Sequence, residues 1–244
     1  MRDLIRSEFR KLRSTRTVYG LLAGAVALVT VAAIGTVSDT SVAELTGPLH
    51  SRVFLNVLPF VLPVFLLSLG IRAFAEEFHH GSIVPTLLAT PDRRRVLLAK
   101  LVVMAGATVV FVVAVETVAI GLGLVLASAK GATVIVVAAP LAASIGKLLG
   151  LGLLWSWIGV GVGLVVKHQV AAVAGSLIWL LIGEQLVGAL ASDIARFLPA
   201  HAANAVFGGE PGSLAPLAGG LVLAGWAAGA MVLGDKVMER RDIA

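Results

Sequence analysis

Long apolar runs alternate with short polar intervals along almost the whole chain of 244 residues. Six of these runs reach about 20 residues, which is long enough for a helix to cross a hydrocarbon core of about 30 Å. The pattern predicts an all-α integral membrane protein that forms a single transmembrane domain over residues 1–244. The six predicted spans are residues 17–37, 53–73, 96–127, 145–166, 169–190 and 215–234.

The composition supports this prediction and excludes several other classes of protein. The chain is 58% hydrophobic and only 14% charged, with a mean hydropathy of +0.99, so most of it does not form a water-exposed surface. The six spans leave no room for a separate soluble domain. The absence of cysteine excludes disulfides, thiolate metal sites and a cysteine nucleophile.

The distribution of basic residues predicts the orientation in the membrane. If both termini are cytoplasmic, 15 of the 19 Lys and Arg residues fall on the cytoplasmic side, whereas the opposite orientation reverses the ratio. We therefore expect a multi-pass protein of the cell inner (plasma) membrane with both termini inside. The net charge of +5 then reflects topology, and we expect no nucleic-acid partner.

Residues 1–16 form a basic segment with a predicted amphipathic face. A helix of this kind lies along the inner membrane interface before the chain enters the lipid bilayer. The alternative is an ordinary positive flank of the first span. Glu8 interrupts the apolar arc, whose members are Leu4, Ile5, Phe9 and Leu12.

Residues 74–95 form the long polar interval on the predicted cytoplasmic side, between the second and third spans. An acidic pair comes first, followed by a Gly-Ser step, a leucine-containing run, a Thr-Pro step, three arginines and a lysine that enters the third span. In order, these residues are Glu76, Glu77, Gly81, Ser82, Leu87, Thr90, Pro91, Arg93, Arg94, Arg95 and Lys100.

This order resembles the segment after the second membrane helix in permease subunits of the type-2 ABC exporter family. Ser82 stands in the position of the threonine of the family's Gly-Thr step. Pro85 interrupts the region of the family's coupling helix. The resemblance implies an N-terminal elbow helix over residues 1–16 and a cytoplasmic coupling helix within residues 74–95. It also implies short extracellular helices in residues 191–214, above the transport path.

The resemblance further implies that this chain works with a separate ABC ATP-binding subunit, for which the residues from Glu76 to Lys100 transmit movement. The path would form between two permease copies and carry a hydrophobic or amphipathic compound such as a drug, an antibiotic or a lipid. We expect no cofactor in this chain and no enzymatic activity of its own, with ATP and Mg²⁺ in the partner. Gly146-Lys147-Leu148 only partly resembles a phosphate-binding loop, because Leu148 replaces the Ser or Thr that binds magnesium.

Other residues are candidates for a gate or for the transport path. Pro59 and Pro63 each remove a backbone donor, so they predict a kink in the outer half of the second span. Glu116 and Lys147 are predicted near the outer leaflet. Two interpretations remain for them: an ion pair that stabilises an outer closed state, or two side chains that reach separately to water.

Glu184 is an intramembrane carboxylate in the fifth span, so it is also a candidate for function. It faces a dimer cavity or outer gate, or it accepts a hydrogen bond from a neighbouring helix. The apolar residues 132–144 contain Pro140. They form either a re-entrant segment or an extension of the fourth span.

An ion-gradient-driven secondary transporter is the alternative function. Inverted repeats and broken helices around charged residues at the membrane midplane are typical of that class. The sequence has neither a clear repeat nor such a cluster. Another polytopic membrane protein without an ATPase partner is the remaining alternative.

Overall fold

The structure is a computed structural model that describes residues 1–48, 58–79, 88, 92–166, 168–209 and 212–239. Within these residues six helical segments are long and apolar enough to cross a membrane, so the predicted all-α membrane fold is confirmed. The segments are α2 (Arg16–Asp39), α5 (Leu58–His79), α7 (Arg93–Ala129), α8 (Ala138–Val165), the run from α9 to α10 (Gln169–Leu190) and α13 (Pro216–Glu239).

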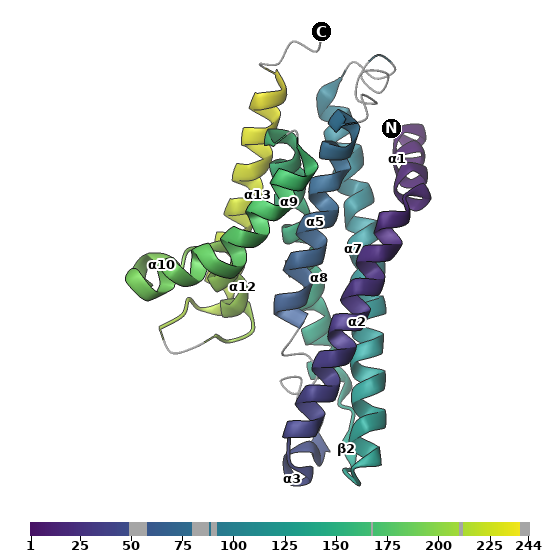
Figure 1. The fold of residues 1–244 in the computed structure, drawn as a ribbon, viewed down its shortest axis with the longest axis vertical. Helices are drawn as coiled ribbons and strands as arrows, with labels where there is room; N and C mark the ends of the chain where they lie inside the picture. The colour runs from purple at the N-terminus through teal and green to yellow at the C-terminus, as the bar shows by residue number, and fades with distance from the viewer. Residues whose placement is uncertain (49–57, 80–87, 89–91, 167, 210–211, 240–244) are drawn as a thin grey trace.

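The long helices pass up and down between two ends of the molecule (Figure 1). We call one end the basic end, because it carries the amphipathic helix α1 (Arg2–Ser14), the arginines at the start of α7 and Lys236 near the end of α13. It lies at the top of Figure 1. The beginning and the end of the described chain thus lie on the same side, as the expected topology requires.

For residues 132–144, the structure favours an extension of the fourth span over a re-entrant segment. Helix α8 begins at Ala138, seven residues before the predicted start at 145. Pro140 lies in its first turn, where a missing backbone donor leaves no hydrogen bond unmade. Just before α8, β2 (Val134–Ile135) pairs in parallel with β1 (Gly47–Pro48).

The end opposite the basic end is braced by a lysine rather than by apolar packing alone. Helix α7 is 37 residues long, or about 56 Å, so it extends beyond a hydrocarbon core of about 30 Å. At its C-cap, the Lys130 ammonium donates to the carbonyl oxygens of Val37 and Ser38 at 2.5 and 2.8 Å. These carbonyls belong to the last turn of α2, where backbone acceptors have no helical partner.

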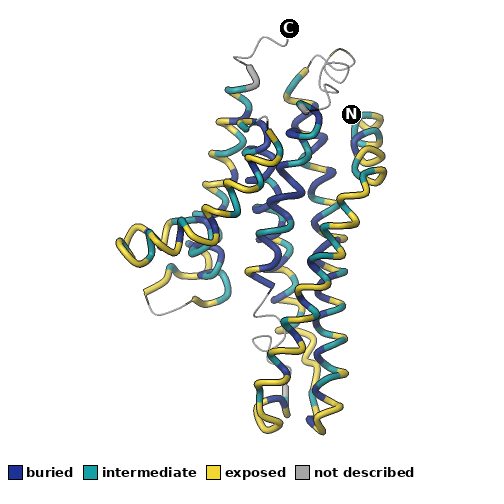
Figure 2. The backbone as a smooth tube through the Cα atoms, in the orientation of Figure 1, coloured by how far each residue is buried: buried dark blue, intermediate teal, exposed yellow. Residues whose placement is uncertain are grey.

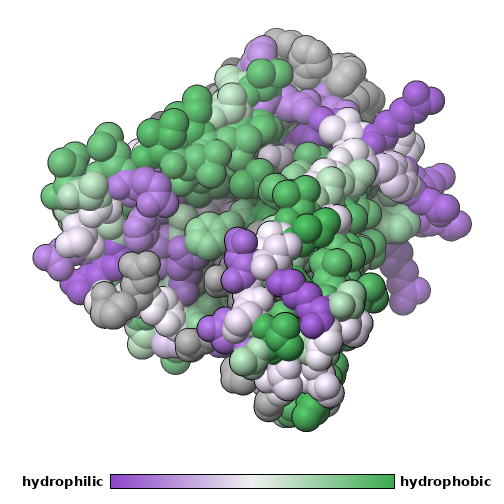
Figure 3. All heavy atoms as spheres, turned by 60° about the horizontal axis from the view of Figure 1, so that its bottom comes forward, coloured by the Kyte–Doolittle hydropathy of each residue, from purple (hydrophilic) through white to green (hydrophobic). Residues whose placement is uncertain are grey.

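The core of the molecule lies on α5 and α8, which form the dark blue centre of Figure 2. The most apolar stretch of α5 is 72% buried and that of α8 is 61%, against 22% for both α2 and α13. Figure 3 shows broad apolar areas on the outer sides of the molecule, as expected for helices that face lipid.

Helices α5 and α8 approach each other closely along a seam of glycines. A Cβ atom on Gly159 would overlap the carbonyl oxygen of Leu67, and one on Gly163 would overlap that of Ile71. The reverse contact involves Gly70 on α5 and the carbonyl oxygen of Ser156 on α8. Small residues allow such backbone contact where lipid and neighbouring helix are equally apolar. We call Gly70, Gly159 and Gly163 the glycine seam.

Candidate functional site

The predicted coupling residues lie at the basic end, around the last turns of α5 and the first turns of α7. Helix α7 begins at Arg93, and the Asp92 side chain caps it by accepting the backbone N–H of Arg95 at 3.2 Å. The predicted residues between the two helices lie outside the described part of the chain: Gly81, Ser82, Leu87, Thr90 and Pro91.

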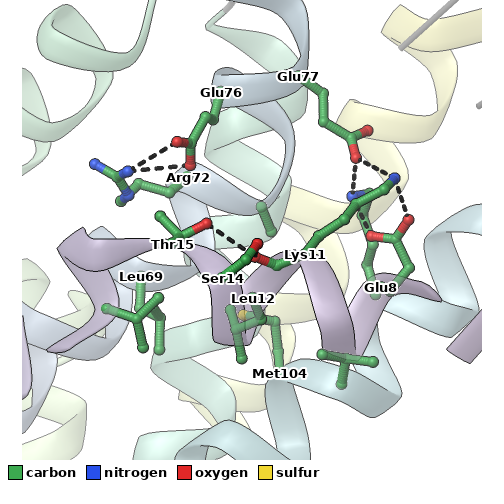
Figure 4. Close-up of a pocket in the computed structure, with 14 residues that line it drawn as sticks. Glu8, Lys11, Leu12, Ser14, Thr15, Leu69, Arg72, Glu76, Glu77 and Met104 are labelled. Carbon is green, nitrogen blue, oxygen red and sulfur yellow. Dashed lines mark hydrogen bonds and ion pairs between the residues drawn. The ribbon is translucent and has the colours of Figure 1, made fainter. Parts of the chain in front are cut away.

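Four charged side chains from three helices form a network at this end. The Lys100 ammonium on α7 lies 2.6 Å from an oxygen of Glu8 on α1 and 2.9 Å from an oxygen of Glu77 on α5. The Lys11 ammonium on α1 contacts the same two carboxylates at 2.6 and 2.8 Å. Figure 4 shows Glu8, Lys11 and Glu77 meeting on one side of the cavity described below. We call Glu8, Lys11, Glu77 and Lys100 the charge network.

Three members of the charge network are buried, the Lys11 side chain is 44% exposed, and the four charges balance. Glu8, Glu77 and Lys100 are 5%, 7% and 3% exposed. Removal of such groups from water costs several kcal/mol per ion, which well-placed opposite charges offset. Two carboxylates and two ammonium groups meet this condition, and the Lys100 ammonium also lies 4.9 Å from the ring centroid of Phe74. The network therefore joins α1, α5 and α7 at the basic end.

The network changes the pKa values of its two members on α1, Glu8 and Lys11. Burial alone raises the pKa of the Glu8 carboxyl, but the ammonium groups of Lys100 and Lys11 outweigh burial and hold this pKa below its ordinary value. Burial alone lowers the pKa of Lys11, but its hydrogen bonds to Glu77 and Glu8 outweigh burial and raise this pKa. Both groups are therefore held in their charged forms.

A second ion pair on α5 joins Arg72 to Glu76, the residue directly before Glu77. The Arg72 guanidinium donates from Nη2 to both carboxylate oxygens of Glu76, at 3.0 and 3.1 Å. The arginines that begin α7 point outward instead, with Arg94 and Arg95 side chains 75% and 67% exposed. The predicted coupling residues thus divide into an inward group, with Glu77 and Lys100, and an outward group of arginines.

An open cavity of about 340 Å³ lies beside the charge network and the Arg72–Glu76 pair, and it is lined by α1, the start of α2, α5 and α7 (Figure 4). Its wall includes all four residues of the charge network, together with Arg72 and Glu76. The remaining lining residues are Leu12, Ser14, Thr15, Val18, Leu69, Ala73, Val103 and Met104.

Comparison with known proteins decides the family. A family profile described as "ABC-2 family transporter protein" matches residues 4–183, which is well over half of the chain and runs from α1 into the fifth span. The chain belongs to the ABC-2 family of transporter proteins. It is a permease, and membership of this family implies association with an ABC ATP-binding subunit. A comparison with curated proteins gives no match.

Two members of the charge network, Glu8 and Lys11, are not among the residues that the sequence pattern predicts to be functional. Glu8 was recognised only as an interruption of the apolar face of residues 1–16. That interruption was itself a usable signal, because a carboxylate on a face that packs against a membrane helix requires a buried cation. Lys100 at the start of the third span was the cation available, although the sequence separation of 92 residues hides the pair.

The predicted gate residues Pro59 and Pro63 both lie in α5. Pro63 is inside the helix, and both prolines are buried. Pro63 cannot donate the hydrogen bond that continues the helical ladder. The structure thus supplies the local cause of the predicted kink, whose size and role in gating remain predictions.

The permease does not bring Glu116 and Lys147 together as an ion pair. Lys147 is exposed, and its ammonium lies 5.6 Å from the ring centroid of Phe207. Glu116 is 3% exposed, and its Oε1 atom has no hydrogen-bond partner among the described residues. The hypothesis of an outer Glu116–Lys147 bridge is therefore wrong for this conformation.

Glu184 adopts the second of its two predicted arrangements, a hydrogen bond to a neighbouring helix. It directly follows the π-helical turn η1 (Trp179–Gly183) at the start of α10 (Glu184–Leu190) and is fully buried. Its Oε2 atom accepts the backbone N–H of Ala200 at 2.9 Å and lies 3.5 Å from Nδ1 of His201.

Two short helices occupy the long connection after the fifth span, as the family resemblance implied. They are α11 (Ser192–Ala195) and α12 (Pro199–Val206). The Glu184 carboxylate lies at the N-terminus of α12, where unpaired backbone N–H groups favour negative charge. This contact holds α12 to the end of the fifth span.

Proposed function

We propose that this permease forms the membrane path of an ATP-driven exporter and is coupled to a separate ABC ATP-binding subunit. Two copies enclose the path in the cell inner (plasma) membrane. The basic end and both termini face the cytoplasm. The cargo is hydrophobic or amphipathic, in the class of drugs, antibiotics or lipids.

The observation that carries this proposal is the charge network at the basic end. Its members Glu77 and Lys100 lie on the two helices that flank the polar segment predicted to contact the partner. A force applied between the end of α5 and the start of α7 therefore reaches α1 through Glu8 and Lys11. Ion pairs suit this role because they hold helices in register and can rearrange between two discrete states.

The outward arginines supply the contact with the ATP-binding subunit. Arg94 and Arg95 begin α7 with exposed side chains, next to the segment between α5 and α7. Exposed charge at an interface steers association and fixes its register more than it adds affinity. We therefore assign docking to these arginines and transmission to the buried network.

The glycine seam supports a path between two permease copies. Helices α5 and α8 contact each other through their backbones, so there is no space for cargo between them. The more exposed spans α2, α13 and the run from α9 to α10 are available to face lipid or a second copy. In this arrangement α5 and α8 move as one body when the partner closes.

Copurification with an ABC ATP-binding subunit tests the proposal. The tagged permease should retain such a subunit, and the ATPase activity of the subunit should depend on the permease. The double variant Arg94→Glu/Arg95→Glu should weaken retention, because it reverses the charge of the docking surface.

Arg196→Glu is the matched control, since Arg196 is exposed on the connection before α12, away from the basic end. It should retain the subunit as the wild type does. The proposal fails if no ATP-binding subunit is retained. It also fails if the Arg94→Glu/Arg95→Glu protein folds, binds and stimulates the ATPase fully.

A further inference from the structure

The cavity between α1, α5 and α7 has the polarity of a site for an amphiphile. At about 340 Å³ it is within the size range of small-molecule sites in proteins. In Figure 4, Arg72, Glu76 and Glu77 lie on its upper side, whereas Leu12, Leu69 and Met104 lie on its lower side.

This gradient follows the direction of the spans. On α5, Glu76 lies about 10 Å closer to the basic end than Leu69, given a rise of 1.5 Å per residue. On α7, Lys100 likewise precedes Val103 and Met104 by one turn. The cavity is therefore charged toward the basic end and apolar toward the middle of the spans, which matches the orientation of a lipid in one leaflet.

The charges that line the cavity favour a zwitterion over a net ion. Three carboxylates and three cations line it, so its formal charge is zero. Glu8, Glu77 and Lys100 are almost fully buried, which leaves the more accessible Lys11, Arg72 and Glu76 to meet a ligand. Two cations and one carboxylate, on helices from two sides of the cavity, are thus the less buried charges of its wall.

Arg72 provides a further sign of an incomplete polar site. Its Nε atom is buried and has no hydrogen-bond partner among the described residues, although Nη2 is paired with Glu76. An unpaired buried donor is unfavourable because it has lost its hydrogen bonds to water. After a small rotation of the side chain, an anionic oxygen in the cavity would supply the missing acceptor.

We propose that this cavity binds the headgroup of a phospholipid that carries a primary ammonium group, as phosphatidylethanolamine does. The phosphate lies between Lys11 and Arg72, and the ammonium donates to Glu76. The glycerol end lies against Leu69 and Met104. The lipid then bridges α1 and α5 beside the Ser14–Thr15 junction, where α1 turns into α2.

Thermal unfolding of the purified, delipidated full chain in detergent tests this site without any ATPase partner. Dioctanoyl phosphatidylethanolamine should raise the unfolding temperature by several degrees in a saturable manner, because it binds only the folded state. Dioctanoyl phosphatidylcholine, whose ammonium has no N–H, should raise it less. Dioctanoyl phosphatidylglycerol, which has no ammonium group, should also raise it less.

Two variants locate the effect. Ala73→Trp fills the cavity from α5 without removing a polar partner and should abolish the shift. Ala228→Trp, on an exposed position of α13, is the matched control and should keep it. Glu76→Gln should remove the preference for the ethanolamine lipid over the choline lipid, and it decides the matter if Ala73→Trp does not fold.

Equal shifts with all three lipids would overturn the proposal, since they indicate general solvation of the apolar surface. An undiminished ethanolamine preference in both folded Ala73→Trp and Glu76→Gln proteins would overturn it as well. Neither result would bear on the docking of an ATP-binding subunit, so failure here is distinguishable from failure of the exporter proposal.

Discussion

The glycine seam and the charge network hold the same helix, α5, to its neighbours by opposite means. The seam joins the middle of α5 to α8 through backbone contacts that no larger side chain can replace. The network joins the end of α5 to α1 and α7 through four side chains whose charges cancel. The first contact resists rearrangement, whereas the second can exchange partners. From this difference we expect the seam to stay rigid and the network to be the contact that can rearrange.

The largest effect is expected when the seam is broken. Gly159→Ala places a methyl group against the carbonyl oxygen of Leu67, which only a separation of α5 and α8 can relieve. We expect a loss of more than about 4 kcal/mol of stability, or no folded protein. Gly146→Ala is the control, because nothing lies within 4 Å of its Cβ position on the same helix. Chemical denaturation in detergent measures both, and equal effects would contradict the account of the seam.

The next largest effect is expected when the charge network loses one partner. Lys100→Met leaves Glu8 and Glu77 with only Lys11, so one buried carboxylate is uncompensated. We expect a loss of about 3–5 kcal/mol. Lys147→Met, at an exposed position, should change stability by less than about 0.5 kcal/mol.

Removing both members of an ion pair distinguishes this cause from a loss of packing. Glu77→Gln added to Lys100→Met restores neutrality, since Glu8 and Lys11 remain. The double variant should therefore be more stable than Lys100→Met alone. A double variant that is less stable, by the sum of the two single losses, would show that the four charges act independently.

The network also predicts how stability depends on pH. Because the folded state lowers the pKa of Glu8 below its ordinary value near 4.5, the Glu8 contribution is complete above that value. It is lost as the pH falls through the lowered pKa. The unfolding temperature should therefore drop on acidification below about pH 4.5, and this drop should be smaller in Glu8→Gln. Glu44→Gln, on an exposed carboxylate at the other end, should keep the full drop.

Lys11 predicts the opposite pH dependence of stability, at alkaline pH. Its pKa is raised above the ordinary value of 10.5, so its contribution is complete below that pH and is lost as the pH rises through the raised pKa. Lys11→Met should flatten the alkaline part of the stability profile. A profile identical to that of the wild type would remove Lys11 from the network.

How well the sequence predicts each region depends on how far apart in the chain its contacting residues lie. The six spans and the close spacing of Gly159 and Gly163 are local patterns, and the structure contains both. Glycine spacing alone does not select the seam, because Gly225 and Gly229 have the same spacing and nothing lies within 4 Å of their Cβ positions. Which glycines make a seam depends on the helix opposite, and the sequence does not name that helix.

The charge network was predictable only in part for the same reason. Glu77 and Lys100 were identified from the order of residues around the polar segment, but their inward orientation was not. Glu8 lies 92 residues from its partner Lys100, so only the three-dimensional packing of α1 on α7 reveals the pair. The fourth span was predicted from residue 145, with an extension into residues 132–144 left open, because the sequence alone does not show that Pro140 lies in a first helical turn.

The smallest effect is expected at the outer pair that does not form. The stability changes of Glu116→Gln and Lys147→Met should add within about 0.5 kcal/mol in the double variant, because the two side chains share no contact. A coupling energy above about 1 kcal/mol would show that they do pair in another conformation.

ATP hydrolysis by the partner subunit in complex with Glu77→Gln/Lys100→Met permease tests the central claim most directly. This variant keeps the outward arginines and a neutral network, so it should fold and retain the ATP-binding subunit. If the charge network transmits movement from the partner to α1, stimulation of the ATPase by the permease should fall several-fold. Unchanged stimulation in this folded, partner-bound variant would contradict the account.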